Sequence, residues 1–253
     1  MIARLIFWCA LLCLLPSTLH AQSTEADLKS RLIDRPLYLR GFWSNNDLHF
    51  DSSGRLLGTS DPFPFTLSGF ALKKVRLKPD KLILEGHRMG LELSDGKQRR
   101  VDIQQPIHIE IAASPDGNYL PALDAIFVDG LANLIPSLPF YWKKSAANNF
   151  LPLDLKDPGA IPSNISHPKI LYSESPMVNQ FARDLLYFGT TTINFWVEPD
   201  GTVSHLSVLR PLGLGLDENA MIALQHYRFA PARKDGKPIT VQMNVVVKFE
   251  QSF

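Results

Sequence analysis

The sequence predicts an α+β protein in two parts. The first is an antiparallel β-rich domain with one covering helix, and the second is a small three-stranded antiparallel sheet with two helices. Apolar and polar residues alternate with a period of two over residues 101–111 and again over residues 241–249, as in strands with one buried face. Short turn sequences separate such runs, and helical spacing of apolar residues is confined to a few stretches.

The first 21 residues have the three parts of a secretory signal peptide. Arg4 precedes an apolar run over residues 5–15, Pro16 ends it, and Ala21 provides a cleavage site. The run is shorter than the ~20 residues of a membrane helix, so a short retained anchor is the alternative interpretation. The chain has two cysteines, and both lie in this segment, so a mature chain would have no disulfide and no cysteine-ligated metal.

The charge balance argues against nucleic acid as a partner. The 26 Lys and Arg residues nearly equal the 25 Asp and Glu residues, which leaves a formal charge of +1. A protein that binds phosphate-rich surfaces carries a clear basic excess. We therefore expect contact with a membrane only if the N-terminal segment is retained.

Residues 22–144 are predicted to form the β-rich domain, whose role the sequence does not indicate. Ile107, Ile109 and Ile111 alternate with polar residues in its clearest strand. Turns are expected at residues 78–81, where proline suits a type I turn, at Asp95-Gly96, and at residues 51–54. Five or six strands are expected in a meander.

Residues 119–135 interrupt the strand pattern. Leu120, Leu123, Phe127, Leu131 and Leu134 fall near helical spacing, so we expect a helix that covers one face of the sheet and stops at Pro136. The aromatic run that follows, residues 138–142, is a binding patch or a plug for the end of the sheet. The second interpretation is favoured, because large aromatic side chains are mostly buried.

Residues 145–168 are predicted to be a proline-rich linker between the domains. The segment reads "SAANNFLPLDLKDPGAIPSNISHP", with four prolines, several small polar residues and no sustained periodicity.

Residues 169–253 then give the order helix, strand, strand, helix, strand. The first helix is expected over residues 176–186, and the Pro199-Asp200-Gly201 turn joins the two strands of a hairpin. Asp217 is expected to be the N-cap of the second helix, which should end at residues 229–231. The last strand has Val241, Met243, Val245, Val247 and Phe249 on one face.

This order resembles the TonB C-terminal domain of bacterial energy transducers. The matching elements are the strand "TTINFWV", the turn "EPDGTV", the strand "SHLSVLR", the helix start "GLDENAMIAL", the helix end "YRFAPAR", the turn "KDGKPIT" and the strand "VQMNVVVKF". The resemblance covers about residues 170–250, and residues 22–150 show none.

The resemblance implies a periplasmic binding module. Proteins similar to TonB contact outer-membrane receptors through a receptor segment that adds as a strand to this sheet, with a possible role in energy-dependent transport across the outer membrane. The partner would be such a receptor or another envelope protein, and an exposed strand edge also permits a homodimer. The alternative is a last strand that only closes the sheet. The implied contact residues are Glu174, Pro176, Met177, Val178, Gln242, Asn244, Val246 and Lys248.

No pattern for an enzyme, a cofactor or a metal is found. His49 with Asp51, and His87 with Glu85, are interpreted as hydrogen-bonded structural residues, because a lone His-x-Asp is a poor metal signal. A second hypothesis is a soluble periplasmic carrier of a small ligand or lipid, built on the β-rich domain with residues 120–142 as a lid. It requires a cavity where the apolar face of residues 101–111 meets the predicted helix.

Overall fold

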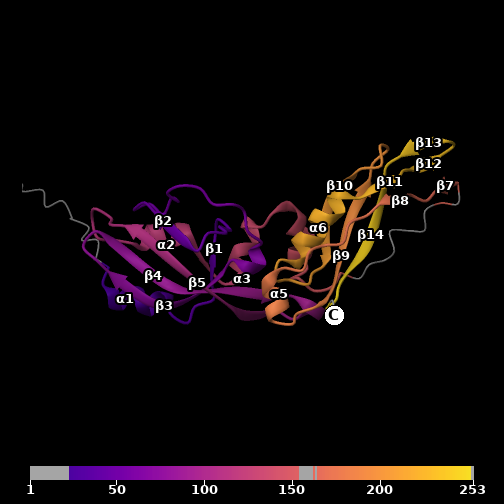
Figure 1. The fold of residues 1–253 in the computed structure, drawn as a ribbon. Helices are drawn as coiled ribbons and strands as arrows, with labels where there is room; N and C mark the ends of the chain where they lie inside the picture. The colour runs from indigo at the N-terminus through magenta and orange to yellow at the C-terminus, as the bar shows by residue number, and fades with distance from the viewer. Residues whose placement is uncertain (1–22, 154–161, 163, 252–253) are drawn as a thin grey trace, which may run out of the picture.

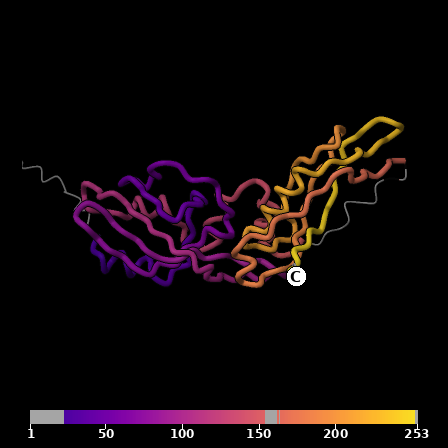
Figure 2. The backbone as a smooth tube through the Cα atoms, in the orientation of Figure 1, coloured from indigo at the N-terminus to yellow at the C-terminus, as the bar shows by residue number. Residues whose placement is uncertain are grey.

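A six-stranded sheet and a three-stranded sheet follow one another along an elongated molecule (Figures 1 and 2). This computed structural model describes residues 23–153, 162 and 164–251. The predicted signal peptide and the middle of the predicted linker, residues 154–161 and 163, lie outside the described residues. The mixed α+β class predicted from the sequence is confirmed.

The first sheet has six strands, in the order β2-β5-β4-β3-β1-β6. All neighbours are antiparallel except β2 and β5, which run parallel. The turn expected at residues 51–54 is present, and after it the chain returns antiparallel to β2 through a single bridge between Phe50 and Leu56. The strands are β1 (Leu37–Leu39), β2 (Asp47–Phe50), β3 (Gly69–Leu77), β4 (Lys81–Glu92), β5 (Arg99–Ala112) and β6 (Phe127–Asp129).

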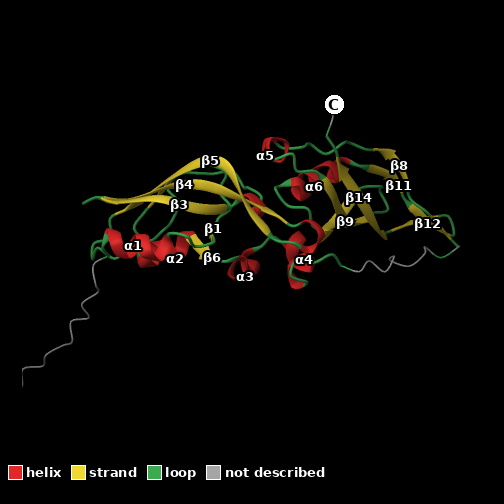
Figure 3. Cartoon of the chain, turned by 90° about the horizontal axis from the view of Figure 1, so that it is seen from below, coloured by secondary structure: helices red, strands yellow, loops and turns green. Residues whose placement is uncertain are grey.

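Two helices cover one face of this sheet, where one was expected (Figure 3). Leu28 and Leu32 of α1 (Glu25–Leu32) and Leu123 and Ile126 of α2 (Leu120–Ile126) are buried in one cluster with Ile109. Ile107 and Ile111 belong to the same cluster, so this part of the strand face is filled by side chains. That packing removes the cavity that the carrier hypothesis requires there.

The helix expected over residues 119–135 was wrong as a continuous element. The chain leaves α2 at Phe127, forms β6, and resumes a short helix at α3 (Leu131–Leu134). β6 pairs with β1, so hydrogen bonding to a neighbouring strand overrides the local helical spacing. Gly130, with φ of 82°, makes the turn between β6 and α3.

The second sheet has the predicted three strands, in the order β10-β9-β14. They are β9 (Gly189–Val197), β10 (Val203–Arg210) and β14 (Val241–Phe249), and both pairings are antiparallel. The helix α6 (Leu216–His226) buries Ala220 and Leu224 against Ile193 and Phe195 of β9.

Three helix boundaries differ from the prediction. The first helix, α5 (Gln180–Asp184), leaves Pro176 outside, because Asn179 caps it by accepting a hydrogen bond from the Ala182 N–H. Gly215 is the N-cap of α6, so the assignment of Asp217 to that position was wrong. α6 ends at His226, and the residues expected to end it form β11 (Arg228–Ala230).

Both ends of the predicted linker carry secondary structure. Residues 143–147 form α4 (Lys143–Ala147), after the short helical turn η4 (Phe140–Trp142), and β7 (Ile165–Ser166) pairs with β12 (Ala232–Lys234). β12 also pairs with β13 (Lys237–Ile239), and β8 (Lys169–Tyr172) pairs with β11. The remaining short turns are η1 (Phe65–Leu67), η2 (Ser94–Gly96) and η3 (Ile135–Ser137).

The two sheets share a hydrophobic core. Leu91 of β4 and Val128 of β6 are buried in the same cluster as Ile193 and Phe195 of β9, and Trp142 belongs to it as well. Within the aromatic run, Leu138 and Trp142 are core residues, whereas Phe140 is exposed.

A short backbone bridge also joins the end of β4 to the loop before α6. The Leu93 N–H donates to the Leu212 carbonyl at 2.8 Å, and the Leu214 N–H donates to the Leu91 carbonyl at 3.0 Å. Leu214 is buried with Leu67 and Ile103 of the first sheet region. The missing side chain of Gly90 makes this possible, since a Cβ there would lie 2.3 Å from Leu214 Cδ2.

No helix in the described part of the chain is both long and apolar enough to cross a membrane.

Candidate partner-binding edge

β14 is an edge strand of the second sheet. It pairs with β9 along its whole length, from Val241 opposite Val197 to Phe249 opposite Gly189. On its other side, no strand among the described residues is hydrogen-bonded to it. In an antiparallel pair, alternate residues direct their N–H and C=O groups away from the partner. β14 therefore presents a row of backbone groups to which another strand can bond.

The opposite edge of the same sheet is covered. η4 and α4 pack against β10, and the Leu153 N–H lies 3.4 Å from the Leu209 carbonyl. The β10 ladder is also broken between Ser204 and Ser207, where His205 has φ of 51°. A bulged and partly covered edge is a poor template for strand addition, so β14 is the better of the two edges.

The predicted contact residues of β14 share its outer face. Val246 is 64% exposed, and Lys248 is ion-paired with Glu250. The other two are held in a hydrogen-bonded row: the Asn194 Nδ2 donates to Asn244 Oδ1 at 2.7 Å, and Gln242 Nε2 donates to Asn194 Oδ1 at 2.8 Å. Among the described residues, Val246 and Lys248 are the members of this set whose side chains form no hydrogen bond with a β9 side chain.

The segment 174–178 lies along α6 in an extended conformation rather than within a helix. Glu174 accepts a hydrogen bond from His226 at 2.7 Å, and the Met177 carbonyl accepts one from Asn219 Nδ2 at 2.7 Å. The Met177 side chain is 78% exposed.

The structure brings the two predicted contact elements together at only one end of β14. A pocket of about 470 Å³ is lined by Pro176, Met177 and Val178 from the segment and by Glu250 and Gln251 after the strand. Gln242 and Asn244 lie farther back along β14 and do not line this pocket.

Two buried acids at the start of α6 were not singled out as a pair by the sequence. Asp217 accepts hydrogen bonds from Thr191 Oγ1 at 2.6 Å and from the Leu212 and Gly213 N–H groups at 2.9 and 2.7 Å. Burial raises its pKa to about 6, although these bonds act in the opposite direction. Asp217 thereby fixes the loop that bridges to β4.

Glu218 faces the first domain. Its Oε1 accepts a hydrogen bond from Trp142 Nε1 at 2.8 Å, while its buried Oε2 has no hydrogen-bond partner in the described part of the chain. Burial, and then the nearby Asp217 charge, raise the pKa of Glu218 to about 8. An acidic residue at a helix start is ordinarily taken as favourable for the helix dipole, so the sequence carried no signal of this contact.

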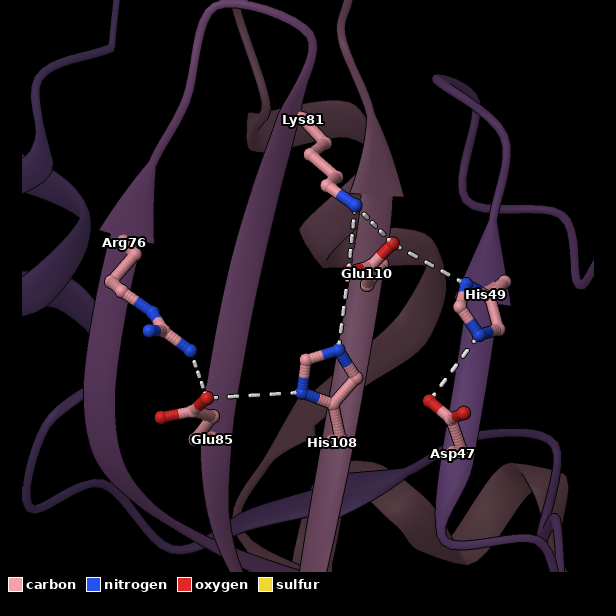
Figure 4. Close-up of polar contacts among 7 residues, drawn as sticks. All are labelled: Asp47, His49, Arg76, Lys81, Glu85, His108 and Glu110. Carbon is pink, nitrogen blue, oxygen red and sulfur yellow. Dashed lines mark hydrogen bonds and ion pairs between the residues drawn. The ribbon is translucent and has the colours of Figure 1, made fainter.

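His49 and His108 of the first sheet lie in a polar network on its uncovered face (Figure 4), whereas His87 pairs with Asp102 at 2.9 Å. Glu110 is its centre: Lys81 Nζ approaches within 2.8 Å, His108 Nε2 within 3.2 Å and His49 Nδ1 within 3.5 Å. The Lys81 hydrogen bond holds the pKa of Glu110 below its usual value. Within the described residues, no group of three or more His, Cys, Asp or Glu side chains has the geometry to hold a metal ion. Asp47, Arg76 and Glu85 complete the network.

Comparison with known proteins places the second sheet in a family. Residues 180–250 match the family model described as the C-terminal part of the Gram-negative bacterial TonB protein. A solved structure that matches is the solution NMR structure of the Pseudomonas aeruginosa TonB C-terminal domain, with 22% identity and a TM-score of 0.30; the match covers 36% of this chain and 90% of that one. The comparison with curated proteins found no match.

The C-terminal part of the chain is therefore a TonB-type C-terminal domain, and the resemblance inferred from its motifs is confirmed. The matched range includes β14 and begins after the segment 174–178.

Proposed function

We propose that the protein is an envelope protein of TonB type whose C-terminal domain binds an extended segment of a partner protein by strand addition to β14. The observation that carries the proposal is the contrast between the two edges of the second sheet: β10 is bulged and covered, whereas β14 has no strand on its outer side among the described residues. Strand addition uses backbone hydrogen bonds for affinity and side chains on one face for selectivity.

The proposed contact surface combines the outer edge of β14 with residues 174–178. Val246 and Met177 supply exposed apolar surface, and the pocket beside Pro176 and Val178 could receive one side chain of the incoming strand. Because Met177 is already held by the α6 side chain of Asn219, little ordering of this segment is needed on binding. The partner we propose is an outer-membrane receptor or another envelope protein, and the activity is binding rather than catalysis.

The proposed organisation is a signal peptide over residues 1–21, a β-rich domain over residues 22–144, a linker over residues 145–168 and the TonB-type domain over residues 169–253. We propose a periplasmic location after cleavage, with retention in the inner membrane as the alternative. N-terminal sequencing of protein recovered from the periplasm decides between them: a mature chain that begins at Gln22 supports cleavage, and recovery of Met1 in the inner-membrane fraction contradicts it. Motor-driven transport would require the second outcome.

The strand-addition proposal is tested with synthetic peptides from the periplasm-exposed N-terminal segments of outer-membrane receptors. On binding, amide exchange should slow in β14 and not in β10, because only new backbone hydrogen bonds protect edge amides. The variant Val246→Glu should weaken binding about tenfold, since it puts a charge on the exposed face that the incoming strand must approach. Leu57→Glu, in the loop after β2, is the matched control, because Leu57 is 51% exposed and belongs to the first sheet region. Protection of β10 instead of β14, or equal effects of the two variants, would refute the proposal.

A further inference from the structure

A second concave site lies where the TonB-type domain meets the β-rich domain. The cleft has a volume of about 650 Å³, within the range of small-ligand sites. Four elements form it: the loop before η1, the aromatic turn η4, the bulged end of β10, and α6. Its main apolar lining consists of Phe63, Phe140, Tyr141, Leu206, Met221 and Ile222.

The apolar lining is incompletely covered. Phe140 is 67% exposed and Ile222 is 54% exposed, although both belong to residue types that are usually buried. The two side chains come from different domains and border one cleft. An apolar ligand seated there would remove both from water.

One charged side chain lies at the wall of this cleft. Glu218 is 9% exposed and lines the cleft, and its Oε1 is occupied by the Trp142 indole. Its Oε2 is buried and has no partner among the described residues. A buried carboxyl oxygen without a partner costs about 1–3 kcal/mol, more if ionised, so a donor that reaches it is strongly favoured.

The charges around Glu218 favour a cation over a neutral donor. The nearest acid, Asp217, accepts hydrogen bonds from a hydroxyl and from backbone N–H groups, so none of these donors brings a positive charge close to Glu218. The other titratable groups bordering the cleft are Tyr141 on η4 and His205 on β10. His205 is stacked on Trp196 at 4.3 Å, bonded to Ser204 and 3.9 Å from the Glu198 carboxylate, so its contacts are with residues other than Glu218.

We propose that this cleft binds a small apolar molecule bearing a protonated amine, with the apolar part between Phe140 and Ile222 and the ammonium group at Glu218 Oε2. No residue of β14 lines this cleft, so a test of the ligand site and a test of strand addition can fail separately. It would couple ligand binding to the contact between the domains, because Glu218 also holds Trp142.

The test uses three probes that differ only in the polar group: 1-naphthylmethylamine, 1-naphthylmethanol and 1-naphthoic acid. They are titrated into the full mature chain, and the indole N–H signal of Trp142 reports binding at Glu218, assigned with Trp142→Phe. The amine should bind at least about tenfold more tightly than the alcohol, and the acid should bind least. At pH 7 the amine should release a proton on binding, measured by calorimetry in two buffers of different ionisation enthalpy, because Glu218 must ionise.

Two variants separate the carboxylate from the apolar walls. Glu218→Gln keeps an acceptor for Trp142 and should abolish the preference for the amine, whereas Glu174→Gln, an exposed control, should leave it unchanged. Ile222→Ala should weaken amine and alcohol equally. Equal affinity of the amine and the alcohol for the unaltered chain, an amine preference that survives Glu218→Gln, or no saturable binding would each overturn the proposal. The measurement on the unaltered chain stands even if Glu218→Gln fails to fold.

Discussion

The substitution Leu214→Ala tests whether the two sheets unfold as one unit. Leu214 belongs to the TonB-type domain in sequence, yet it is fully buried against Leu67 and Ile103 of the β-rich domain. Truncating a fully buried leucine costs about 2–5 kcal/mol through lost burial and the cavity that remains. The backbone bond from Leu214 to the Leu91 carbonyl persists in the variant, so we take about 3 kcal/mol as the expected loss.

The assay follows both domains in the same molecule. With a urea m-value of about 3 kcal/mol/M, a loss of 3 kcal/mol lowers the unfolding midpoint by about 1 M. Hydrogen exchange read by mass spectrometry on peptides from β5 and β9 then shows where stability is lost. If the shared core makes one cooperative unit, exchange accelerates by the same factor in both peptides.

Ile222→Ala is the control, because a half-exposed side chain on α6 should cost well under 1 kcal/mol. Two separate unfolding transitions, with Leu214→Ala affecting only the β9 peptide, would refute the argument for a shared core. So would a midpoint shift no larger than that of the control.

Three further predictions concern the same interface. Burial raises the pKa of Glu218 from 4.5 to about 8, so the contribution of this group to stability is complete below pH 4.5 and is lost as the pH rises through 8. The free energy of unfolding should therefore fall between pH 4.5 and 8, and it should fall less in Glu218→Gln. Parallel pH profiles of the two proteins would contradict this. Trp142→Phe should lower the melting temperature, because it leaves both Glu218 carboxyl oxygens without a donor, at a cost of about 1–3 kcal/mol beyond the lost packing. In a protein that already carries Trp142→Phe, the effect of Glu218→Gln on stability should be smaller. Additive effects in the double variant would argue against the contact. Gly213→Ala should destabilise the protein more than Gly236→Ala, although both glycines have positive φ. A Cβ at position 213 would lie 2.3 Å from the Leu91 carbonyl oxygen, whereas no atom lies within 4 Å of a Cβ at position 236. Equal unfolding midpoints of the two variants in urea would contradict the close approach.

Local patterns were sufficient where a segment's structure depends on its own residues. The alternation over Val241–Phe249 and the Pro199-Asp200-Gly201 turn predicted strands that the structure contains, in the predicted three-stranded arrangement. The same local reasoning failed where a distant partner decided the outcome. Phe127 has helical spacing from its neighbours, but its segment pairs with β1 and becomes a strand.

The candidate edge was predicted in part. The sequence indicated β14 and the segment 174–178, and the structure adds that the second edge of the sheet is covered by α4 and η4. It also places Gln242 and Asn244 in hydrogen bonds to Asn194, so these two are less available than Val246. Which edge is free depends on how distant segments pack, and periodicity carries no information about that.

The sequence by itself determined the α+β fold class, the presence of a TonB-type domain and the order of the main elements in that domain, because hydrophobic period and turn chemistry are local properties. Only the tertiary structure decided how the two halves meet. Leu214 beside Gly90, and Glu218 beside Trp142, are pairs separated by long stretches of chain. Their contacts arise because two sheets that are distant in sequence bury surface against each other. These contacts give the two domains a common core.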